Sequence, residues 1–225
     1  MREHIREHAL SLFFGVIFLV ALVGQSIAGL LVYNDEEVAH GGTEVSYLDF
    51  ITSNAFVVDV AENWQSEYLQ FFLFILATIW LVQKGSPESK KPGDEGIDSD
   101  ADQRVGESLS EDSPQWAKAG GWRLFVYSNS LLLGMGGIFV LSWFVQSLAG
   151  VVVFNDEQMQ HGDATLNWFS YVASADFWNR TLQNWQSEFL AVGSMVAFSI
   201  YLRQRGSSES KPVGTPHLET AQEAE

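Results

Sequence analysis

The residues best suited to chemistry stand in a pentapeptide that the chain contains twice. Asn-Trp-Gln-Ser-Glu occupies residues 63–67 and again residues 184–188, an offset of 184 − 63 = 121 residues. On a helix, side chains three and four positions apart share a face, so three polar side chains of each copy would lie together. These are Asn63, Ser66 and Glu67 in the first copy and Asn184, Ser187 and Glu188 in the second.

The two glutamates allow two interpretations. An ionisable group in or near a membrane span is a candidate functional residue, because its exposure to lipid is costly. Glu67 and Glu188 could then line a cation or proton pathway. Alternatively, each glutamate lies in the first turn of a helix, where the helix dipole stabilises a carboxylate at the depth of the lipid headgroups. We prefer the second interpretation, because both glutamates stand close to the start of an apolar run.

Two glutamines complete this candidate polar site. Gln25 and Gln146 are also 121 residues apart, and each precedes a glycine by four positions. In lipid, a buried amide beside a small residue commonly bonds to a neighbouring helix. We therefore expect a role in packing, in which Gln25 reaches toward Ser66 or Asn63.

A histidine and a glutamate form a second candidate site in each copy. Glu36 and His40 are four residues apart, and so are Glu157 and His161. Two such residues on one helical face could bind zinc or iron, and Glu67 with Glu188 could complete the ligand set. However, the glycine that follows each histidine favours a helix end, where a histidine close to the last carbonyl groups needs no metal. A metal site is therefore the less favoured interpretation.

Composition excludes several classes of function. The chain has no cysteine, which excludes disulfides, thiolate metal sites and a cysteine nucleophile. The net charge of −16 argues against nucleic acid as a partner, because phosphate binding requires clustered lysine and arginine. The sequence has no Ser-His-Asp arrangement, phosphate-binding glycine loop or dinucleotide fingerprint in a suitable context. We therefore expect no enzymatic activity and no cofactor.

Four apolar runs must position these residues. Residues 9–33 and 128–154 contain no charged side chain, and residues 64–83 and 185–203 form two further runs. About 20 apolar residues suffice to cross the hydrocarbon core of a bilayer, so the sequence predicts an all-α membrane protein with four transmembrane helices. The first run could instead be a signal peptide, because Ser-Ile-Ala-Gly at its end mimics a cleavage site. Ser-Leu-Ala-Gly at residues 147–150 repeats that ending inside the chain, which favours a retained helix.

The offset of 121 residues predicts the domain organisation. The two halves align at this offset without a gap, from Arg2 with Arg123 to Lys90 with Lys211, which indicates a duplication. The predicted units are two helical hairpins at residues 1–84 and 122–205, a disordered acidic linker at 85–121 and a disordered tail at 206–225. Each hairpin crosses twice, so the two repeats are parallel. The connecting segments, 34–63 and 155–184, hold either short amphipathic helices at the membrane surface or ordinary packed loops.

Basic residues predict the orientation. Eleven of the twelve lysines and arginines fall on the side that both termini share with the linker, and only Arg180 falls on the other. Loops rich in lysine and arginine remain in the cytoplasm, so this distribution predicts a multi-pass protein of the plasma membrane with cytoplasmic termini and linker. The external segments are acidic, with eight acids and no base in residues 34–67 and five acids and one base in residues 155–188. The expected partners are the lipid bilayer and a second copy or another membrane protein.

Several motifs carry a family resemblance. Residues 9–12, 34–41, 63–70 and 83–90 together resemble an uncharacterised family of small prokaryotic integral membrane proteins, one of the domains of unknown function. The resemblance implies a membrane protein without an established activity, so it assigns no site residue.

A structural or accessory envelope protein is our first hypothesis, a small cation or proton pathway the second, and a metal-dependent membrane enzyme the third. The second copy has Arg180 where the first has Asp59, and Gln183 where the first has Glu62, so we expect the halves to differ in function.

Overall fold

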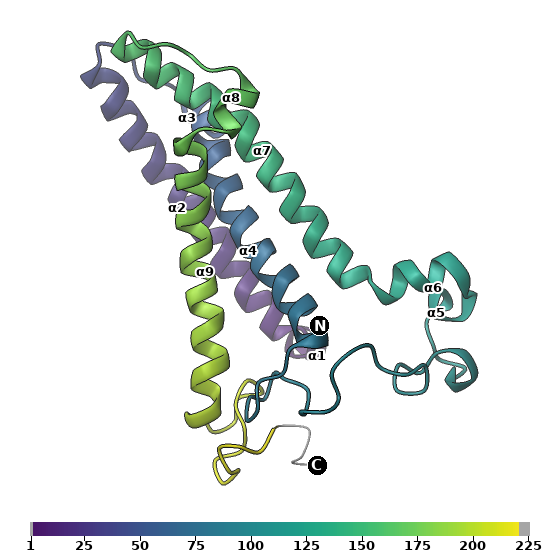
Figure 1. The fold of residues 1–225 in the computed structure, drawn as a ribbon. Coiled ribbons are helices and arrows are strands. Elements are labelled where there is room, and N and C mark those ends of the chain that lie inside the picture. Colours follow the sequence, from purple (N-terminus) through teal and green to yellow (C-terminus); the bar gives the residue numbers. More distant parts are fainter. Residues whose placement is uncertain (1, 221–225) are drawn as a thin grey trace. The chain divides into compact units, whose positions relative to one another are not determined.

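Helices account for all the regular structure in the part of the chain that the computed structural model describes, residues 2–220, and no strand occurs there. The all-α prediction is therefore confirmed for these residues. Four helices are long: α2 (Ala9–Ala39), α4 (Asn54–Trp80), α7 (Ser130–His161) and α9 (Ala175–Tyr201) (Figure 1). The short elements are α1 (Arg2–Glu7), α3 (Tyr47–Ile51), the 3-10 helix η1 (Gly106–Ser108), α5 (Gln115–Ala119), α6 (Gly121–Ser128) and α8 (Trp168–Val172).

Side-chain caps explain where two long helices begin. α4 starts ten residues before the predicted apolar run at residue 64, and α9 starts ten residues before the run at residue 185. The hydroxyl of Ser53 accepts the backbone N–H of Phe56, and that of Ser174 accepts the N–H of Phe177, each at 3.3 Å. Serine is a preferred N-cap because its oxygen satisfies an otherwise unpaired donor of the first turn. The polar residues after each cap are therefore helical as well.

The early start changes the place of the two glutamates. Glu67 lies 67 − 54 = 13 residues after the first residue of α4, and Glu188 lies 188 − 175 = 13 residues after that of α9. Neither is in a first turn, so the preferred interpretation of a carboxylate at the dipole-stabilised end of a helix is wrong. The reason is that the cap lies upstream of the apolar run, and apolar periodicity does not detect a cap.

The chain divides into two compact units. The first unit contains residues 1–61 and 145–177, and the second contains residues 62–144 and 178–225. Each unit therefore combines one segment from each half of the sequence, whereas the predicted hairpins, 1–84 and 122–205, each follow one half. The structure thus groups corresponding segments of the two halves with each other.

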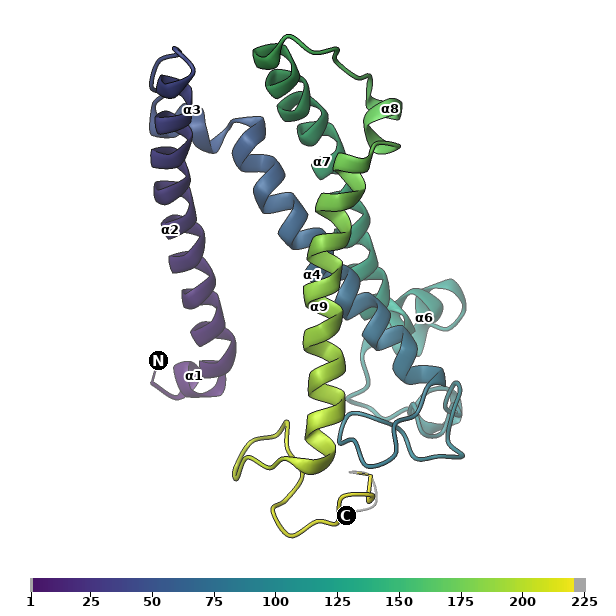
Figure 2. The same cartoon turned by 60° about the vertical axis from the view of Figure 1, so that its left-hand side comes forward.

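Two short helices in the first unit occupy the predicted external segments. The Ser46 hydroxyl caps α3 by accepting the N–H of Asp49 at 3.3 Å, and Asn167 Oδ1 caps α8 by accepting the N–H of Ser170 at 3.0 Å. Figure 2 shows α3 beside the end of α2. Each short helix buries one aromatic side chain, Phe50 in α3 and Tyr171 in α8.

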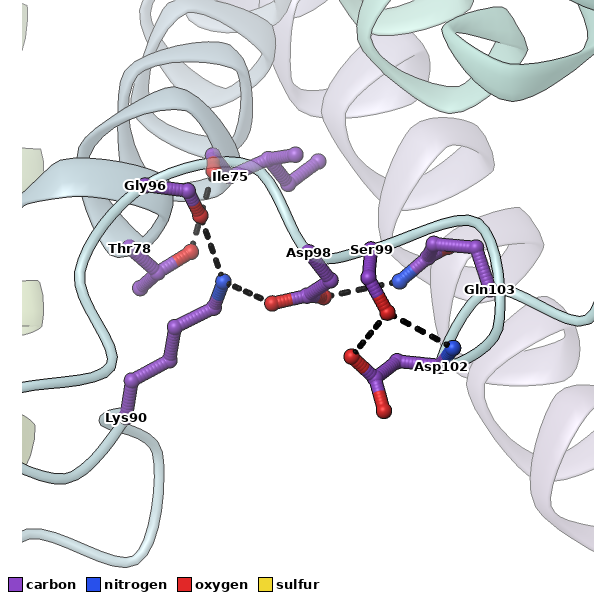
Figure 3. A network of polar contacts seen from close by, with 8 residues as sticks. All are labelled: Ile75, Thr78, Lys90, Gly96, Asp98, Ser99, Asp102 and Gln103. Carbon is purple, nitrogen blue, oxygen red and sulfur yellow. Dashed lines mark hydrogen bonds and ion pairs between the residues drawn. The ribbon is translucent and has the colours of Figure 1, made fainter.

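In the second unit, the linker makes defined contacts. Figure 3 shows Lys90 Nζ donating to the carbonyl of Gly96 at 2.7 Å and to the carboxylate of Asp98. The other oxygen of Asp98 accepts from Gln103 Nε2 at 2.7 Å. The Gly96 N–H donates to the carbonyl of Ile79 at 2.7 Å, which joins this network to the last turn of α4.

The predicted tail makes comparable contacts. Lys211 Nζ donates to three backbone carbonyls, those of Pro216, His217 and Glu219, at 3.3, 2.8 and 2.9 Å. The N–H of Gly85 in the linker donates to Thr220 Oγ1 at 3.3 Å, so linker and tail meet in the second unit. The last five residues of the tail, 221–225, lie outside the described residues.

Candidate functional site

The two pentapeptides contact each other in the second unit. The indole N–H of Trp185 donates to Gln65 Oε1 at 2.7 Å, and Gln65 Nε2 donates to the carbonyl of Glu62 at 3.1 Å. Gln65 is 0 % exposed. A buried amide is tolerated when its donor and acceptor are both bonded, and here both are. The middle of the pentapeptide therefore joins α4 to α9.

The carboxylates of the pentapeptides also come near each other. Glu67 is exposed on α4, and Glu188 is half-buried on α9. Glu188 is close enough for its charge to repel that of Glu67. The structure thus brings together the two glutamates that were expected to form a candidate site.

Three other polar side chains of the pentapeptides donate to backbone carbonyls. Ser66 and Ser187 donate to the carbonyls three residues earlier, those of Asn63 and Asn184, at 2.8 and 2.9 Å. Asn184 Nδ2 donates to the carbonyl of Arg180 at 3.0 Å. A serine bonded to its own helix has its donor occupied, so these hydroxyls stabilise conformation and offer little to a ligand.

The predicted glutamines lie in the first unit and differ in burial. Gln25 is exposed on α2, whereas Gln146 on α7 is 0 % exposed. Neither amide atom of Gln146 has a hydrogen-bond partner among the described residues. A buried amide without partners costs about 1–3 kcal/mol. Gln25 and Gln146 thus correspond in the two halves of the sequence, but one is exposed and the other is buried.

The histidines terminate helices. His40 directly follows α2, and its Nδ1 is 2.8 Å from the carbonyl oxygen of Glu36. His161 is the last residue of α7, and its Nδ1 is 2.8 Å from the carbonyl oxygen of Glu157. Each ring therefore contacts a backbone carbonyl four residues earlier. Among the side chains that the structure describes, those of residues 5–220, no three histidines, aspartates or glutamates are grouped so as to hold a metal ion.

Two asparagines outside the candidate set organise the connecting segments. Asn34 bonds both backbone groups of Val45: Oδ1 accepts the N–H at 2.9 Å, and Nδ2 donates to the carbonyl at 3.2 Å. Asn155 bonds Leu166 in the same way, at 2.7 and 2.9 Å. These asparagines correspond at the offset of 121 residues, but no role was predicted for them. Their recurrence before a polar segment was the available signal.

A tryptophan cluster in the second unit was also missed. The ring centroids of Trp143, Trp178 and Trp185 are 5.9, 6.1 and 6.4 Å apart, and Trp143 Nε1 is 3.5 Å from Thr181 Oγ1. Aromatic pairs at such distances add about 0.5–1.5 kcal/mol beyond burial of their area. The first half has Leu22 and Val57 at the positions that correspond to Trp143 and Trp178, so the cluster belongs to the second half alone.

An ion pair joins the positions at which the two halves differ. Arg180 Nη1 is 3.6 Å from Glu62 Oε2, and both side chains are partly buried. Arg180 replaces Asp59 at the offset, and Gln183 replaces Glu62. The base of the second half thus neutralises an acid of the first.

Two cavities lie in the second unit, and neither is lined by Glu67 or Glu188. One, of about 440 Å³, is lined at the end of α4 by residues that include Phe74, Leu81 and Glu88, with Val196 of α9. The other, of about 700 Å³, is formed by residues 204–213 of the tail. The paired carboxylates therefore stand outside both cavities.

Two of the described helices, α2 and α7, are long and apolar enough to cross a membrane by length and composition. α4 and α9 have 27 residues each but carry charged side chains in their first halves. Two apolar helices suggest association with a membrane and do not establish the number of spans.

Comparison with known proteins places the chain in a family. No curated protein and no solved structure matches it. A family model for a domain of unknown function matches residues 1–222, nearly the whole chain. The resemblance inferred from the motifs is thereby confirmed as membership of an uncharacterised family, and the family supplies no activity for the paired pentapeptides. This protein belongs to the family defined by the domain of unknown function DUF6766.

Proposed function

We propose that this protein is a multi-pass plasma-membrane protein with four spans, arranged as two tandem hairpins. One observation on α7 carries the proposal. This helix lies in the middle of the chain, where a signal peptide is not expected. Only 28 % of its apolar 18-residue stretch is buried. The core helix of a soluble protein would be mostly buried. Lipid accounts for a long, apolar and largely uncovered helix inside a chain.

The lengths of α4 and α9 support two further spans. Each has 27 residues, or about 40 Å at 1.5 Å per residue, which exceeds a hydrocarbon core of about 30 Å. Residues 68–83 and 189–202 contain no charge, and the charged residues precede them. The first halves of α4 and α9 then extend into the outer headgroup region with Glu67 and Glu188. The ion pair of Glu62 with Arg180 reduces the net charge carried there.

Matching contacts support an ancestral duplication. The paired bonds of Asn34 and Asn155 are one example. At the ends of α4 and α9, the N–H of Gln83 donates to Ser89 Oγ at 2.7 Å, and that of Gln204 donates to Ser210 Oγ at 2.9 Å. These contacts are 121 residues apart in the chain. Recurrence of side-chain bonds favours duplicated hairpins over a chance likeness in sequence.

Within this topology we assign the protein a structural or accessory role in the envelope. Gln65 bonds to Trp185, and Ser66 and Ser187 bond to their own helix backbone, which is the pattern of a packing device. The external segments expose carboxylates, among them Asp35, Glu36 and Glu157. Such a surface suits a second membrane protein with basic side chains, whereas another copy of the chain would have to associate through other surfaces. We propose no enzymatic activity and no cofactor.

Cysteine labelling tests the topology, because the chain has no cysteine of its own. Thr43→Cys and Ala164→Cys are exposed positions 121 residues apart in the two external segments, and Asp112→Cys lies in the linker. We expect a membrane-impermeant maleimide to label the first two variants in intact cells and the linker variant only after permeabilisation. Labelling of Asp112→Cys in intact cells would refute the orientation, and release of the protein by alkaline extraction would refute the spans.

A cation or proton pathway is the second candidate function. The repulsion between Glu188 and Glu67 favours it, because paired carboxylates near a bilayer can bind or relay cations. Ion flux into vesicles reconstituted with the parent, Glu67→Gln and Glu188→Gln tests this idea. A pathway requires flux above empty vesicles in the parent and a loss in both variants. Flux at the empty-vesicle level in all three removes it.

A further inference from the structure

The segment before α7 differs in charge from the rest of the cytoplasmic linker. Residues 85–114 contain nine acids, whereas residues 115–155 contain none. Lys118 in α5 and Arg123 in α6 fall within this acid-free stretch. Lys118 Nζ donates to the backbone carbonyl of Glu111 and, as an ammonium group, keeps two further donors. In a chain with a net charge of −16, these two bases within an acid-free stretch form an unusual cationic element.

α5 and α6 pack against each other as one short hairpin, drawn in Figure 1 just before α7. Gly120 and Gly121 join the two helices with φ values of 66° and 54°, a left-handed turn that glycine adopts without strain. The turn brings the rings of Trp116 and Trp122 to a centroid distance of 5.9 Å, edge to face. The Arg123 guanidinium carbon is 5.6 Å from the centre of the Trp122 ring.

The aromatic side chains of this hairpin are exposed. Trp116 is 45 % exposed, and Trp122 and Phe125 are each 67 % exposed. Tryptophan is enriched where one part of a ring meets lipid and the other meets water. Exposed aromatic residues beside basic residues on a short helix are typical of segments that lie in a membrane interface.

We propose that the α5–α6 hairpin docks on the cytoplasmic leaflet and binds anionic phospholipid headgroups. Lys118 and Arg123 contact the headgroup phosphates, while Trp116, Trp122 and Phe125 enter the interface. This inference rests on the proposed membrane topology. The choice of lipid follows from continuity, because α6 ends at Ser128 and α7 begins at Ser130. The hairpin therefore lies where a span would leave the bilayer.

Charge complementarity selects an anionic headgroup. A basic residue near an anionic leaflet gains about fivefold in its binding equilibrium, and the acidic part of the linker is repelled by the same leaflet. Docking would therefore hold residues 115–128 on the surface together with Glu111, whose carbonyl accepts from Lys118, while residues 85–110 extend away from it. The hairpin would mark the point at which the linker leaves the membrane.

The test uses the full chain in lipid nanodiscs, with an environment-sensitive NBD fluorophore on Ala119→Cys, an exposed position beside Lys118. We expect a blue-shifted emission that is stronger in discs containing phosphatidylglycerol than in discs of phosphatidylcholine alone. Changing Lys118→Gln and Arg123→Gln together should reduce docking in the anionic discs by at least tenfold. The matched control is Lys91→Gln with Arg104→Gln, which removes the same charge from the linker outside the hairpin and should leave the emission unchanged.

Each remaining outcome overturns the proposal. Emission typical of water in both kinds of disc would exclude docking. Equal shifts in both lipids, or an equal loss in the control variant, would exclude recognition of anionic headgroups by Lys118 and Arg123. Failure of the chain to enter discs would refute the membrane topology itself and is detected separately, before any emission is read, by the absence of protein from the disc fraction.

Discussion

Trp185 donates its indole N–H to Gln65 Oε1 at 2.7 Å, and this bond links the two copies of one pentapeptide. The bond is asymmetric. Gln65 of the first copy is buried, whereas the corresponding Gln186 of the second copy is exposed. Identical residues thus play different parts, one as a buried acceptor and the other as a surface side chain.

This asymmetry predicts unequal effects of the same substitution. Gln65→Leu leaves the Trp185 N–H without its acceptor and should lower the free energy of unfolding in detergent micelles by about 1–3 kcal/mol. Gln186→Leu is the matched control and should change it by less than about 0.5 kcal/mol, as is usual for surface positions. Similar losses for both variants would show that the bond between the copies contributes nothing specific.

Gln146 predicts a stabilising substitution. Both of its amide atoms are buried without a hydrogen-bond partner in the described part of the chain, so Gln146→Leu removes an uncompensated desolvation cost. We expect the free energy of unfolding to rise by about 1–3 kcal/mol. Gln25→Leu, at the exposed corresponding position, should have little effect. A clear loss of stability on changing Gln146 would instead indicate that its amide binds a partner group.

Gly150 predicts a steric requirement. A Cβ at this position would lie 2.5 Å from the hydroxyl oxygen of Tyr171, whose ring is buried and cannot easily move. Overpacking of this kind costs about 1–3 kcal/mol, so Gly150→Ala should lower the melting temperature. Gly137→Ala is the control, since no described atom beyond its neighbours in the helix lies within 4 Å of its added Cβ, and it should stabilise α7 by up to about 1 kcal/mol. Equal melting temperatures in the two variants would contradict the close approach of α8 to α7.

Glu88 predicts a dependence of stability on pH. Burial, together with the nearby charge of Glu209, raises the pKa of this carboxyl group above its usual value. The folded state therefore holds the proton more tightly than the unfolded state, so this contribution is fully present below the unfolded pKa and is lost as pH rises through the folded pKa. Glu88→Gln should raise stability at neutral pH and flatten the pH profile between mildly acidic and neutral conditions.

Thermal unfolding at a series of pH values measures this effect. Glu209→Gln should flatten the profile in part, because it removes only the second cause of the shift. Glu111→Gln, an exposed acid of the linker, is the control and should leave the profile unchanged. A parent protein whose stability rises with pH over the same window would reverse the sign of the prediction and refute it.

Local patterns were sufficient to predict some features of this fold. The uncharged runs at 9–33 and 128–154 predicted α2 and α7, because an apolar run of such length is too long for a strand and is typical of a long helix. The glycines after His40 and His161 predicted the ends of the same helices, because a glycine at the required positive φ is a local signal. The exact starting residues of α4 and α9, ten residues upstream of the apolar runs, were not predicted, since each depends on a single serine cap in a polar segment.

By itself, the sequence determined that this protein is helical, that its polar motifs recur 121 residues apart and that it belongs to an uncharacterised family. These properties depend on composition, spacing and identity along the chain. Only the tertiary structure decided that Gln65 meets Trp185, that Glu62 pairs with Arg180 and that Gln146 is buried without a partner among the described residues. The physical reason is that such contacts join different helices, and hydrophobic periodicity specifies which face of a helix is apolar but not which neighbour covers it.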